Sequence, residues 1–269
     1  MVIEWTGPIL TAYRHRTDLK DLLAGGLAML LGKGVSLAFT GMQGAGKTVL
    51  LDHLTGKASK EDYRTPPGSQ AIERGVVKSP SKRIRVSVVP GQNSQPRRLA
   101  LEQLFRGRSA VQGVVHVVSY GYASARTEDT TRYMLRDLKL STLARYVKHQ
   151  LDQELKDLDQ TCEAIRASHH RYHAPGWLIV AVDKIDLYYD RLPKAREYYS
   201  SMNDSPFTER LRTLARQVGE DFFRWEVAPV CGALEDFAWN NKVEESKVDR
   251  ETRDAYLAQF IELIRSYCV

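Results

Sequence analysis

A glycine-rich stretch of eight residues, 41–48, constrains the fold of this chain more than any other feature. It reads Gly-Met-Gln-Gly-Ala-Gly-Lys-Thr and matches the pattern GxxxxGK[ST] in full. An apolar, β-forming run over residues 35–40 enters it, and a helix-compatible run over 48–54 leaves it. In such a loop, successive backbone N–H groups surround a phosphate at the positive end of a helix. The stretch therefore predicts a strand, a phosphate-binding loop and a helix within an α/β domain.

Each position of the loop has an expected role. The glycines let the backbone turn tightly around the phosphates. Lys47 is expected to reach the β- and γ-phosphates, and the Thr48 hydroxyl to ligate Mg²⁺. The expected phosphate-binding residues are Gly41, Gln43, Gly44, Ala45, Gly46, Lys47 and Thr48. The pattern predicts binding of a nucleoside triphosphate; the alternative is a glycine-rich turn that binds no ligand.

The composition is that of an ordinary soluble globular protein. The 269 residues suffice for one elaborated α/β domain or two small ones, with 27% charged and 43% hydrophobic residues. The net charge of +6 favours acidic partners, although solubility alone explains it equally well. Three widely spaced cysteines without a CxxC pair are typical of a reducing compartment, so we expect a cytoplasmic location.

We expect no signal peptide, transmembrane segment or lipid anchor. The first residues lack a basic segment followed by an apolar stretch. Residues 22–39 are apolar but are interrupted by glycines, which favours a short helix, a turn and a buried strand. Cys268 is followed only by Val269, which excludes a prenylation motif, and Val2 excludes myristoylation at position 2.

Strand and helix patterns alternate after the phosphate loop. Further strands are expected at residues 71–78, 83–89, 113–120, 177–182 and 222–230, and a closing amphipathic helix at 250–267. The first two of these strands are joined by a short turn at 79–81, so they pair antiparallel. The pattern predicts a mostly parallel six-stranded sheet with helices on both faces and one antiparallel edge strand.

An unusually long connection, residues 121–175, separates two of the expected strands. Apolar residues recur in it at steps of three and four from Leu140 to Ile165, which predicts one helix of about 30 residues, roughly 45 Å long. Such a helix either projects as a partner-binding arm or packs along the sheet. We expect an N-terminal extension at 1–34 and a nucleotide-binding domain at 35–269 that contains this helical insertion.

The phosphate loop does not distinguish ATPases, kinases and GTPases, but later residues do. Asp183-Lys184-Ile185-Asp186 follows the expected strand 177–182, and Cys231-Gly232-Ala233-Leu234 follows strand 222–230. Residues 88–92 read Val-Val-Pro-Gly-Gln, and Thr65 lies in the linker after the first helix. The segment 183–186 is similar to the motif NKxD, and the segment 231–234 is similar to SAK. Residues 88–92 are similar to DxxGQ, and Thr65 is placed like the threonine of switch I. From about residue 35 to 267 the chain resembles the Ras-like small GTPases.

The resemblance implies specific roles at the base and at the γ-phosphate. The carboxylate of Asp186 would accept two hydrogen bonds from guanine, the stem of Lys184 would lie on the base, and the guanine-binding set would be Asp183, Lys184, Asp186, Gly232 and Ala233. Adenine offers no matching pair of donors, so the selection for guanine is strong. Gly91 would donate its N–H to the γ-phosphate, and Gln92 would orient the attacking water as the catalytic residue. Thr65 would join Thr48 at Mg²⁺, with GTP or GDP as the bound nucleotide.

Three departures from the family pattern concern metal binding, activation by a partner, and the amide that ties the base-binding loop to the phosphate loop. Val88 replaces the aspartate that supports Mg²⁺ through water, and Gln43 crowds the position where a glycine of Ras admits a partner's arginine. Asp183 stands in place of an asparagine. Gln92 occupies the position of the family's water-orienting glutamine. The alternative is that it is an ordinary loop residue after a Pro-Gly turn. We therefore expect a switch protein with slow GTP hydrolysis; the alternatives are a GTP-binding module that does not hydrolyse and, less favoured, an ATP-dependent enzyme.

The region between residues 57 and 108, which contains both expected switches, is markedly basic. Its basic residues are Lys57, Lys60, Arg64, Arg74, Lys78, Lys82, Arg83, Arg85, Arg97, Arg98, Arg106 and Arg108, against four acidic ones. Small GTPases usually meet their effectors on this surface, so an effector protein with an acidic face is the expected partner. A nucleic-acid backbone would also suit the charge but is less favoured, because charge runs are mostly solvated faces.

Overall fold

The computed structural model describes Trp5 and residues 35–59, 63–64, 73–78, 83–91, 95–106, 111–169 and 175–268. The turn expected at 79–81, the switch threonine Thr65 and the catalytic Gln92 lie outside these ranges. So does the expected N-terminal extension, apart from Trp5.

The centre of the domain is a six-stranded sheet with the order β2-β3-β1-β4-β5-β6. The strands are β1 (Ser36–Gly41), β2 (Glu73–Lys78), β3 (Arg83–Val88), β4 (Gly113–Val118), β5 (Trp177–Val182) and β6 (Arg224–Pro229). All neighbouring pairs are parallel except β2 with β3. The predicted fold class, a mostly parallel sheet with one antiparallel edge strand, is confirmed. A separate antiparallel hairpin, β7 (Phe237–Trp239) with β8 (Lys242–Glu244), was not predicted.

The central strands form because their apolar runs can be buried on both sides. Every residue of β4 and β5 is buried. In β4, Val114 and Val118 point into one hydrophobic cluster, whereas Val115 and Val117 point into the other. Since the side chains of a strand alternate between its faces, a continuous β-branched run suits only a sheet covered on both sides.

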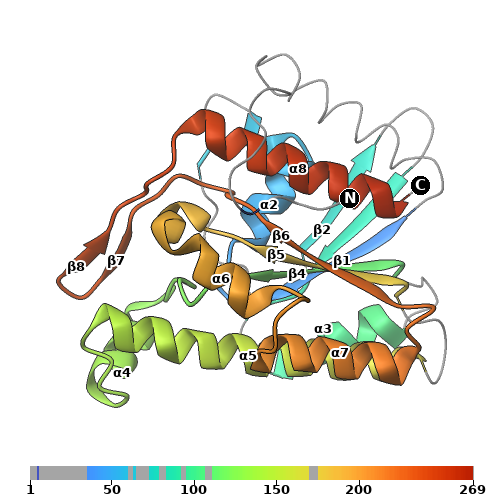
Figure 1. The fold of residues 1–269 in the computed structure, drawn as a ribbon, viewed down its shortest axis with the longest axis horizontal. Helices are drawn as coiled ribbons and strands as arrows, with labels where there is room; N and C mark the ends of the chain where they lie inside the picture. The colour runs from blue at the N-terminus through green and yellow to red at the C-terminus, as the bar shows by residue number, and fades with distance from the viewer. Residues whose placement is uncertain are drawn as a thin grey trace.

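Helices cover both faces of the sheet (Figure 1). On one face lie α2 (Lys47–Leu54) and α8 (Arg250–Cys268), and on the other lie α3 (Gln95–Arg106), α5 (Leu143–His169) and α7 (Pro206–Val218). The shorter elements are α4 (Glu128–Arg136), α6 (Leu192–Tyr199) and the 3₁₀ helices η2 (Lys57–Ser59) and η3 (Ile185–Arg191). The apolar face predicted for the last helix is confirmed, with Tyr256, Phe260, Leu263 and Ile264 buried. Within the described ranges, no helix combines the length and apolarity needed to cross a bilayer.

The long helix of the insertion is α5, which has 27 residues. It packs against α3, α7 and β1, and its buried residues extend from Tyr146 to Ser168, so it covers the sheet and is not a projecting arm. The predicted apolar stripe is only partly correct, because the buried face is largely polar, with Gln150, Glu154, Asp157, Thr161 and Ser168. Of these side chains, Glu154 bonds to backbone N–H groups directly after β4, whereas Thr161 and Ser168 donate to carbonyls of their own helix.

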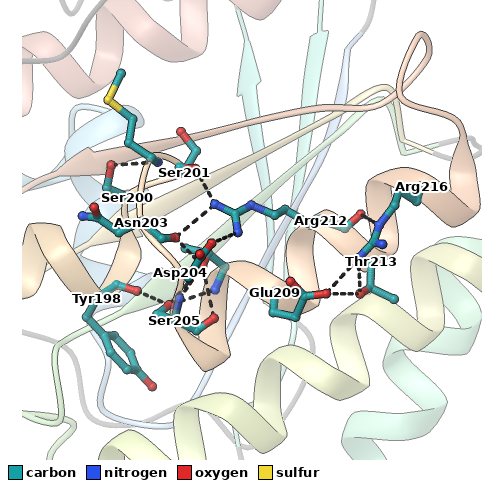
Figure 2. Close-up of polar contacts among 12 residues, drawn as sticks. Tyr198, Ser200, Ser201, Asn203, Asp204, Ser205, Glu209, Arg212, Thr213 and Arg216 are labelled. Carbon is teal, nitrogen blue, oxygen red and sulfur yellow. Dashed lines mark hydrogen bonds and ion pairs between the residues drawn. The ribbon is translucent and has the colours of Figure 1, made fainter.

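The start of α7 is fixed by a polar turn after α6 (Figure 2). The Ser205 hydroxyl accepts the N–H of Thr208 at 3.1 Å and donates to the carbonyl of Tyr198 at 2.6 Å. Arg212 reaches back from the helix and donates to the carbonyls of Ser201 and Asn203 at 2.8 and 3.1 Å. An N-cap of this kind satisfies backbone donors that the first helical turn leaves without partners. The turn thereby directs α7 along α5.

Glu154 of α5 fixes the backbone directly after β4. Its Oε1 accepts the N–H groups of Ser119 and Gly121 at 2.9 and 3.1 Å and lies 3.3 Å from the Ser119 hydroxyl. Its Oε2 accepts the Tyr199 hydroxyl at 2.5 Å. The carboxyl group is buried, and burial raises its pKa, while these hydrogen bonds lower it. One side chain thus anchors the chain where it leaves the sheet towards the candidate site.

Replacing Glu154 by Leu is expected to lower the free energy of unfolding by about 3–5 kcal/mol, because two buried N–H groups lose their acceptor. Glu154→Gln is the matched control. It keeps one carbonyl oxygen for both N–H groups, so its loss should stay below about 1 kcal/mol. Urea denaturation of both variants measures the difference. Equal stability of the Leu and Gln variants would contradict the anchoring role.

Candidate nucleotide-binding site

The three sequence motifs meet at one edge of the sheet. The phosphate loop follows β1, the segment 183–186 follows β5, and the segment 231–234 follows β6. These strands are parallel, so their carboxyl ends lie at the same edge, where ligands of open α/β sheets bind. The segment after β4 lies between them at this edge.

The backbone of the phosphate loop touches three neighbouring segments. Gly41, Gly44 and Gly46 all have positive φ angles, of 125°, 78° and 110°. A Cβ atom on Gly41 would collide with the carbonyl of Val117 in β4, and one on Gly44 with the backbone of Ser124. One on Gly46 would collide with the carboxylate of Asp183. Only glycine fits these positions, because a side chain is excluded by both conformation and space.

Lys47 lies at the start of α2 with its charged group folded over the loop. Its Nζ donates to the carbonyls of Gly41 and Met42 at 2.8 and 2.6 Å, and the side chain is buried. Gly46 caps α2 and provides no side-chain hydrogen bond to its first turn. The positive end of the helix and the ammonium group therefore lie together, as anion binding requires. Thr48, which follows, is half-buried.

The loop after β3 closes against the phosphate loop. The Gln43 N–H donates to the carbonyl of Gly91 at 2.9 Å, and a Cβ atom on Gly91 would collide with the Gln43 backbone. Gly91 thus lies next to the phosphate loop, as its expected role requires. The side chain of Val88 belongs to the buried apolar core and offers no ligand to a metal.

Asp183 joins the segment 183–186 to both other motifs. Its Oδ1 accepts the N–H of Gly232 at 2.8 Å, while its Oδ2 lies beside Gly46 of the phosphate loop. The aspartate therefore still links the loop of Gly232 to the phosphate loop, although it lacks the amide of the family's asparagine. It is buried, and burial raises the pKa of this carboxyl group.

Lys184 links the same segment to the chain after β4. It adopts a left-handed conformation, with φ 61°, and its Nζ donates to the Tyr122 carbonyl and the Ser124 hydroxyl at 2.7 and 2.9 Å. The N–H of Ser124 in turn donates to the carbonyl of Gly44 at 3.3 Å. Burial lowers the pKa of Lys184, and the ring of Phe237 lies 5.7 Å from its Nζ. The β7–β8 hairpin therefore lies beside the segment 183–186.

Asp186 is buried without a partner for its carboxylate. The residue is 1% exposed, and neither oxygen makes a hydrogen bond of standard geometry within the described part of the chain, although the Ser246 hydroxyl and the Cys231 thiol lie close enough to affect its pKa. Burial raises its pKa; the nearby Ser246 hydroxyl and Cys231 thiol lower it in part. The backbone N–H of Lys247 donates to the Asp186 carbonyl at 2.9 Å, so the segment after the hairpin lies against this residue. A buried carboxylate with unused acceptors fits a ligand with paired N–H donors.

The loop 231–234 is fixed from behind by His53. The Nε2 atom of His53, in the last turn of α2, lies 2.7 Å from the carbonyl of Gly232 and therefore carries the proton. Burial is the main cause that lowers the pKa of His53, so the ring is neutral near pH 7. The carbonyl of Gly232 and the N–H of Ala233 share one trans peptide, so Ala233 directs its N–H away from His53.

The sequence analysis missed three side chains of the site, Ser124, His53 and Ser246. Ser124 follows β4 at the same edge as the motifs, so the topology was the signal that could have identified it. No motif spacing in the sequence identifies His53 or Ser246 as part of the site, because the residues that they contact are distant in sequence. Arg97, which was counted in the basic surface, is completely buried, and that assignment was wrong. The exposed basic side chains that the structure describes in residues 57–108 are Lys57, Arg64, Arg85 and Arg98.

Comparisons with known proteins find matches among solved structures. No family model and no curated protein sequence matches the chain. The match to a structure of the small COPII coat GTPase SAR1 of Encephalitozoon cuniculi, in complex with GDP, spans 93% of this chain and 90% of the SAR1 chain, at 14% identity and a TM-score of 0.39. The match to a structure of the signal recognition particle receptor complex SRb-GTP/SRX of Chaetomium thermophilum spans 74% of this chain and 94% of the matched chain, at 12% identity and a TM-score of 0.44.

The chain resembles a divergent Ras-like G domain. This resemblance rests on features of the chain itself: the strand order, the phosphate loop and the position of the segment 183–186 after β5. The residues that the sequence assigned to phosphate and guanine are brought together at one edge of the sheet.

Replacing Asp183 by Asn is expected to stabilise the ligand-free protein at neutral pH. Because the folded state raises the pKa of this carboxyl group, it binds a proton more tightly than the unfolded chain does. Its contribution to stability therefore falls as the pH rises from its ordinary pKa through the raised one. Asn has no charge and keeps an oxygen for the Gly232 N–H.

The gain in unfolding free energy should be on the order of 1 kcal/mol at about pH 8 and vanish near pH 4. Thermal denaturation of both proteins across this range measures it. A difference between the two proteins that does not change with pH would refute the effect of charge.

Proposed function

We propose that this protein binds GTP, hydrolyses it slowly and signals its nucleotide state to a partner protein. The observation that carries the proposal is Asp186, a buried carboxylate whose two oxygens have no hydrogen-bond partner in the described part of the chain. Guanine presents two adjacent N–H donors to such a group, whereas adenine presents none in that arrangement. An adenine-specific site would leave the carboxylate buried and unpaired, at a high cost in free energy.

The neighbouring groups support the same orientation of the nucleotide. The Ala233 N–H, turned away from His53, would meet the guanine oxygen, and the stem of Lys184 would lie on the base. The phosphates would lie in the loop 41–48, with Lys47 released from the carbonyls that it now contacts. The segment that contains Ser246 now lies against Asp186, so we expect it to move when the base enters.

Mg²⁺ fits this site through one described side chain, the Thr48 hydroxyl beside the phosphate loop. When bound, the ion would neutralise charge on the β- and γ-phosphates. Thr65, the second expected ligand, lies outside the described residues. The buried, apolar Val88 gives the ion no support, and this observation favours a second candidate function: a GTP-binding module that does not hydrolyse its nucleotide.

The partner would bind on the side of α3, which lies directly after the loop of Gly91. Arg98 of this helix is exposed and basic, like Arg85 of β3. Beside it, a groove of about 840 Å³ runs between α3 and α5, with Leu101 and Phe105 on one wall and Gln160 on the other. A change in the position of Gly91 would alter this surface, which is the behaviour that a switch needs.

Replacing Asp186 by Ala should weaken GTP binding by about 2–4 kcal/mol, because two guanine donors lose their acceptors, and should barely change ATP binding. Asp221→Asn is the control, because Asp221 is an exposed acid that precedes β6 at the opposite edge of the sheet. Titration calorimetry with both nucleotides measures the affinities of the wild type and of the two variants. Equal losses for GTP and ATP, or no loss, would exclude recognition of guanine by Asp186.

Gln92→Ala should slow GTP hydrolysis without changing GTP affinity, since the side chain orients water and does not hold the nucleotide. We expect the wild-type rate to be ~10⁻⁴–10⁻³ s⁻¹, as for an unassisted small GTPase, or lower. Single-turnover assays with ample Mg²⁺ measure both rates. If the wild type leaves GTP intact over many hours and the variant behaves identically, the non-hydrolysing module replaces the switch.

A further inference from the structure

Arg97, in the first turn of α3, is a charged residue in the interior of the domain. Its side chain is 0% exposed, although Arg98, the next residue of the helix, is exposed. Burying a guanidinium group costs several kcal/mol unless it is paired and hydrogen-bonded. The contacts of Arg97 therefore need to account for its position.

These contacts join three parts of the chain. Nη1 donates to the carbonyl of Gly41 at 3.1 Å and to the carbonyl of Pro90 at 3.0 Å. Nε donates to the Gln160 side chain at 3.1 Å, and Nη2 lies 2.7 Å from a carboxylate oxygen of Asp157. The planar guanidinium group thus connects the phosphate loop and the loop after β3 to α5, in a fork geometry that lysine cannot reproduce.

The contact with Pro90 determines the direction of the next N–H group. The Pro90 carbonyl and the Gly91 N–H belong to one peptide, and the described residues contain no cis peptide bond. In a trans peptide these two groups point in opposite directions. Because the carbonyl points at the buried Arg97, the N–H of Gly91 points away from Arg97, and Gly91 itself lies beside the phosphate loop.

The contact with Gly41 concerns the lysine of the phosphate loop. The Gly41 carbonyl accepts both Lys47 Nζ, at 2.8 Å, and Arg97 Nη1. When a triphosphate draws Lys47 to its phosphates, Arg97 still satisfies this carbonyl. The lysine therefore leaves without exposing an unpaired buried acceptor, which would otherwise cost free energy.

Asp157 keeps the guanidinium in place. It lies on the buried face of α5, and burial raises its pKa while Arg97 and Lys47 lower it. Its other oxygen lies 4.0 Å from His116 Nε2. The pKa of His116 is lowered to about 3, mainly by burial and further by Arg97 and Lys47, so its ring is neutral. Arg97 is therefore the cation that faces this carboxylate at ion-pair distance.

We propose that Arg97 is a positioning residue for the γ-phosphate: it holds the Pro90 carbonyl so that the Gly91 N–H faces the nucleotide. This inference rests on the proposed function, since it assumes that a guanosine triphosphate occupies the site. It makes Arg97 the residue that lets the protein distinguish a triphosphate from a diphosphate, although Arg97 contacts neither. A purely structural arginine would affect both nucleotides alike.

The test is Arg97→Lys, which keeps the charge beside Asp157 but cannot serve both carbonyls and the carboxylate together. Affinities are measured for GDP and for a slowly hydrolysed GTP analogue. We expect the affinity for the analogue to fall about tenfold, the loss expected when one N–H group no longer meets a charged phosphate. The affinity for GDP should change less than about threefold, because GDP lacks the γ-phosphate.

Two further variants separate the outcomes. Arg224→Lys, at an exposed arginine where β6 begins at the opposite edge of the sheet, should leave both affinities unchanged. Gln160→Met removes the acceptor of the Arg97 Nε group and should lower the ratio of the two affinities in the same direction by about two- to threefold, even if Arg97→Lys does not fold. Equal losses for both nucleotides, or unchanged affinities in the Arg97 and Gln160 variants, would overturn the proposal. Failure of the proposed function is a different result: the wild type itself would bind neither guanine nucleotide.

Discussion

The phosphate loop can adopt its conformation only where glycine backbone touches three other segments, and the rest of the site depends on this packing. Gly41 lies against β4, Gly44 against Ser124, and Gly46 against Asp183. Each glycine has a positive φ angle and no room for a Cβ atom. The phosphate loop is therefore fixed to the sheet, to the segment after β4 and to the segment 183–186 before any ligand binds. Such preorganisation reduces the entropy that binding must overcome.

Buried side chains shape the site through the backbone. Two peptide groups assigned to the nucleotide are each held at the carbonyl from the interior: Pro90–Gly91 by Arg97, and Gly232–Ala233 by His53. Because a trans peptide directs its N–H opposite to its carbonyl, both contacts turn an N–H group outward. The neutral ring of His53 provides one donor. This arrangement gives the buried Arg97 and the half-buried His53 a common part in orienting the backbone of the candidate site.

The sequence predicts those features that local patterns encode. The runs 113–118 and 177–182 are too apolar for any place except a buried parallel sheet, and the motifs after the strands had to meet at its carboxyl edge. Arg97 could not be placed, because its partners Gly41 and Gln160 are remote in sequence and only the packing of α3 on α5 brings them together. For the same reason the polar face of α5 and the contact of Ser246 with Asp186 were not predicted. An apolar stripe indicates a helix, but it does not show which polar residues the interior needs.

The identity of the base tests the account most directly. The purified protein is incubated with Mg²⁺ and equal concentrations of GTP, GDP, ATP and ADP, free nucleotide is removed, and the retained nucleotide is identified by mass spectrometry. The unpaired carboxylate of Asp186 beside Lys184 and Ala233 predicts that GTP and GDP are retained and that adenine nucleotides are not. Retention of ATP or ADP in preference to the guanine nucleotides would contradict the central claim.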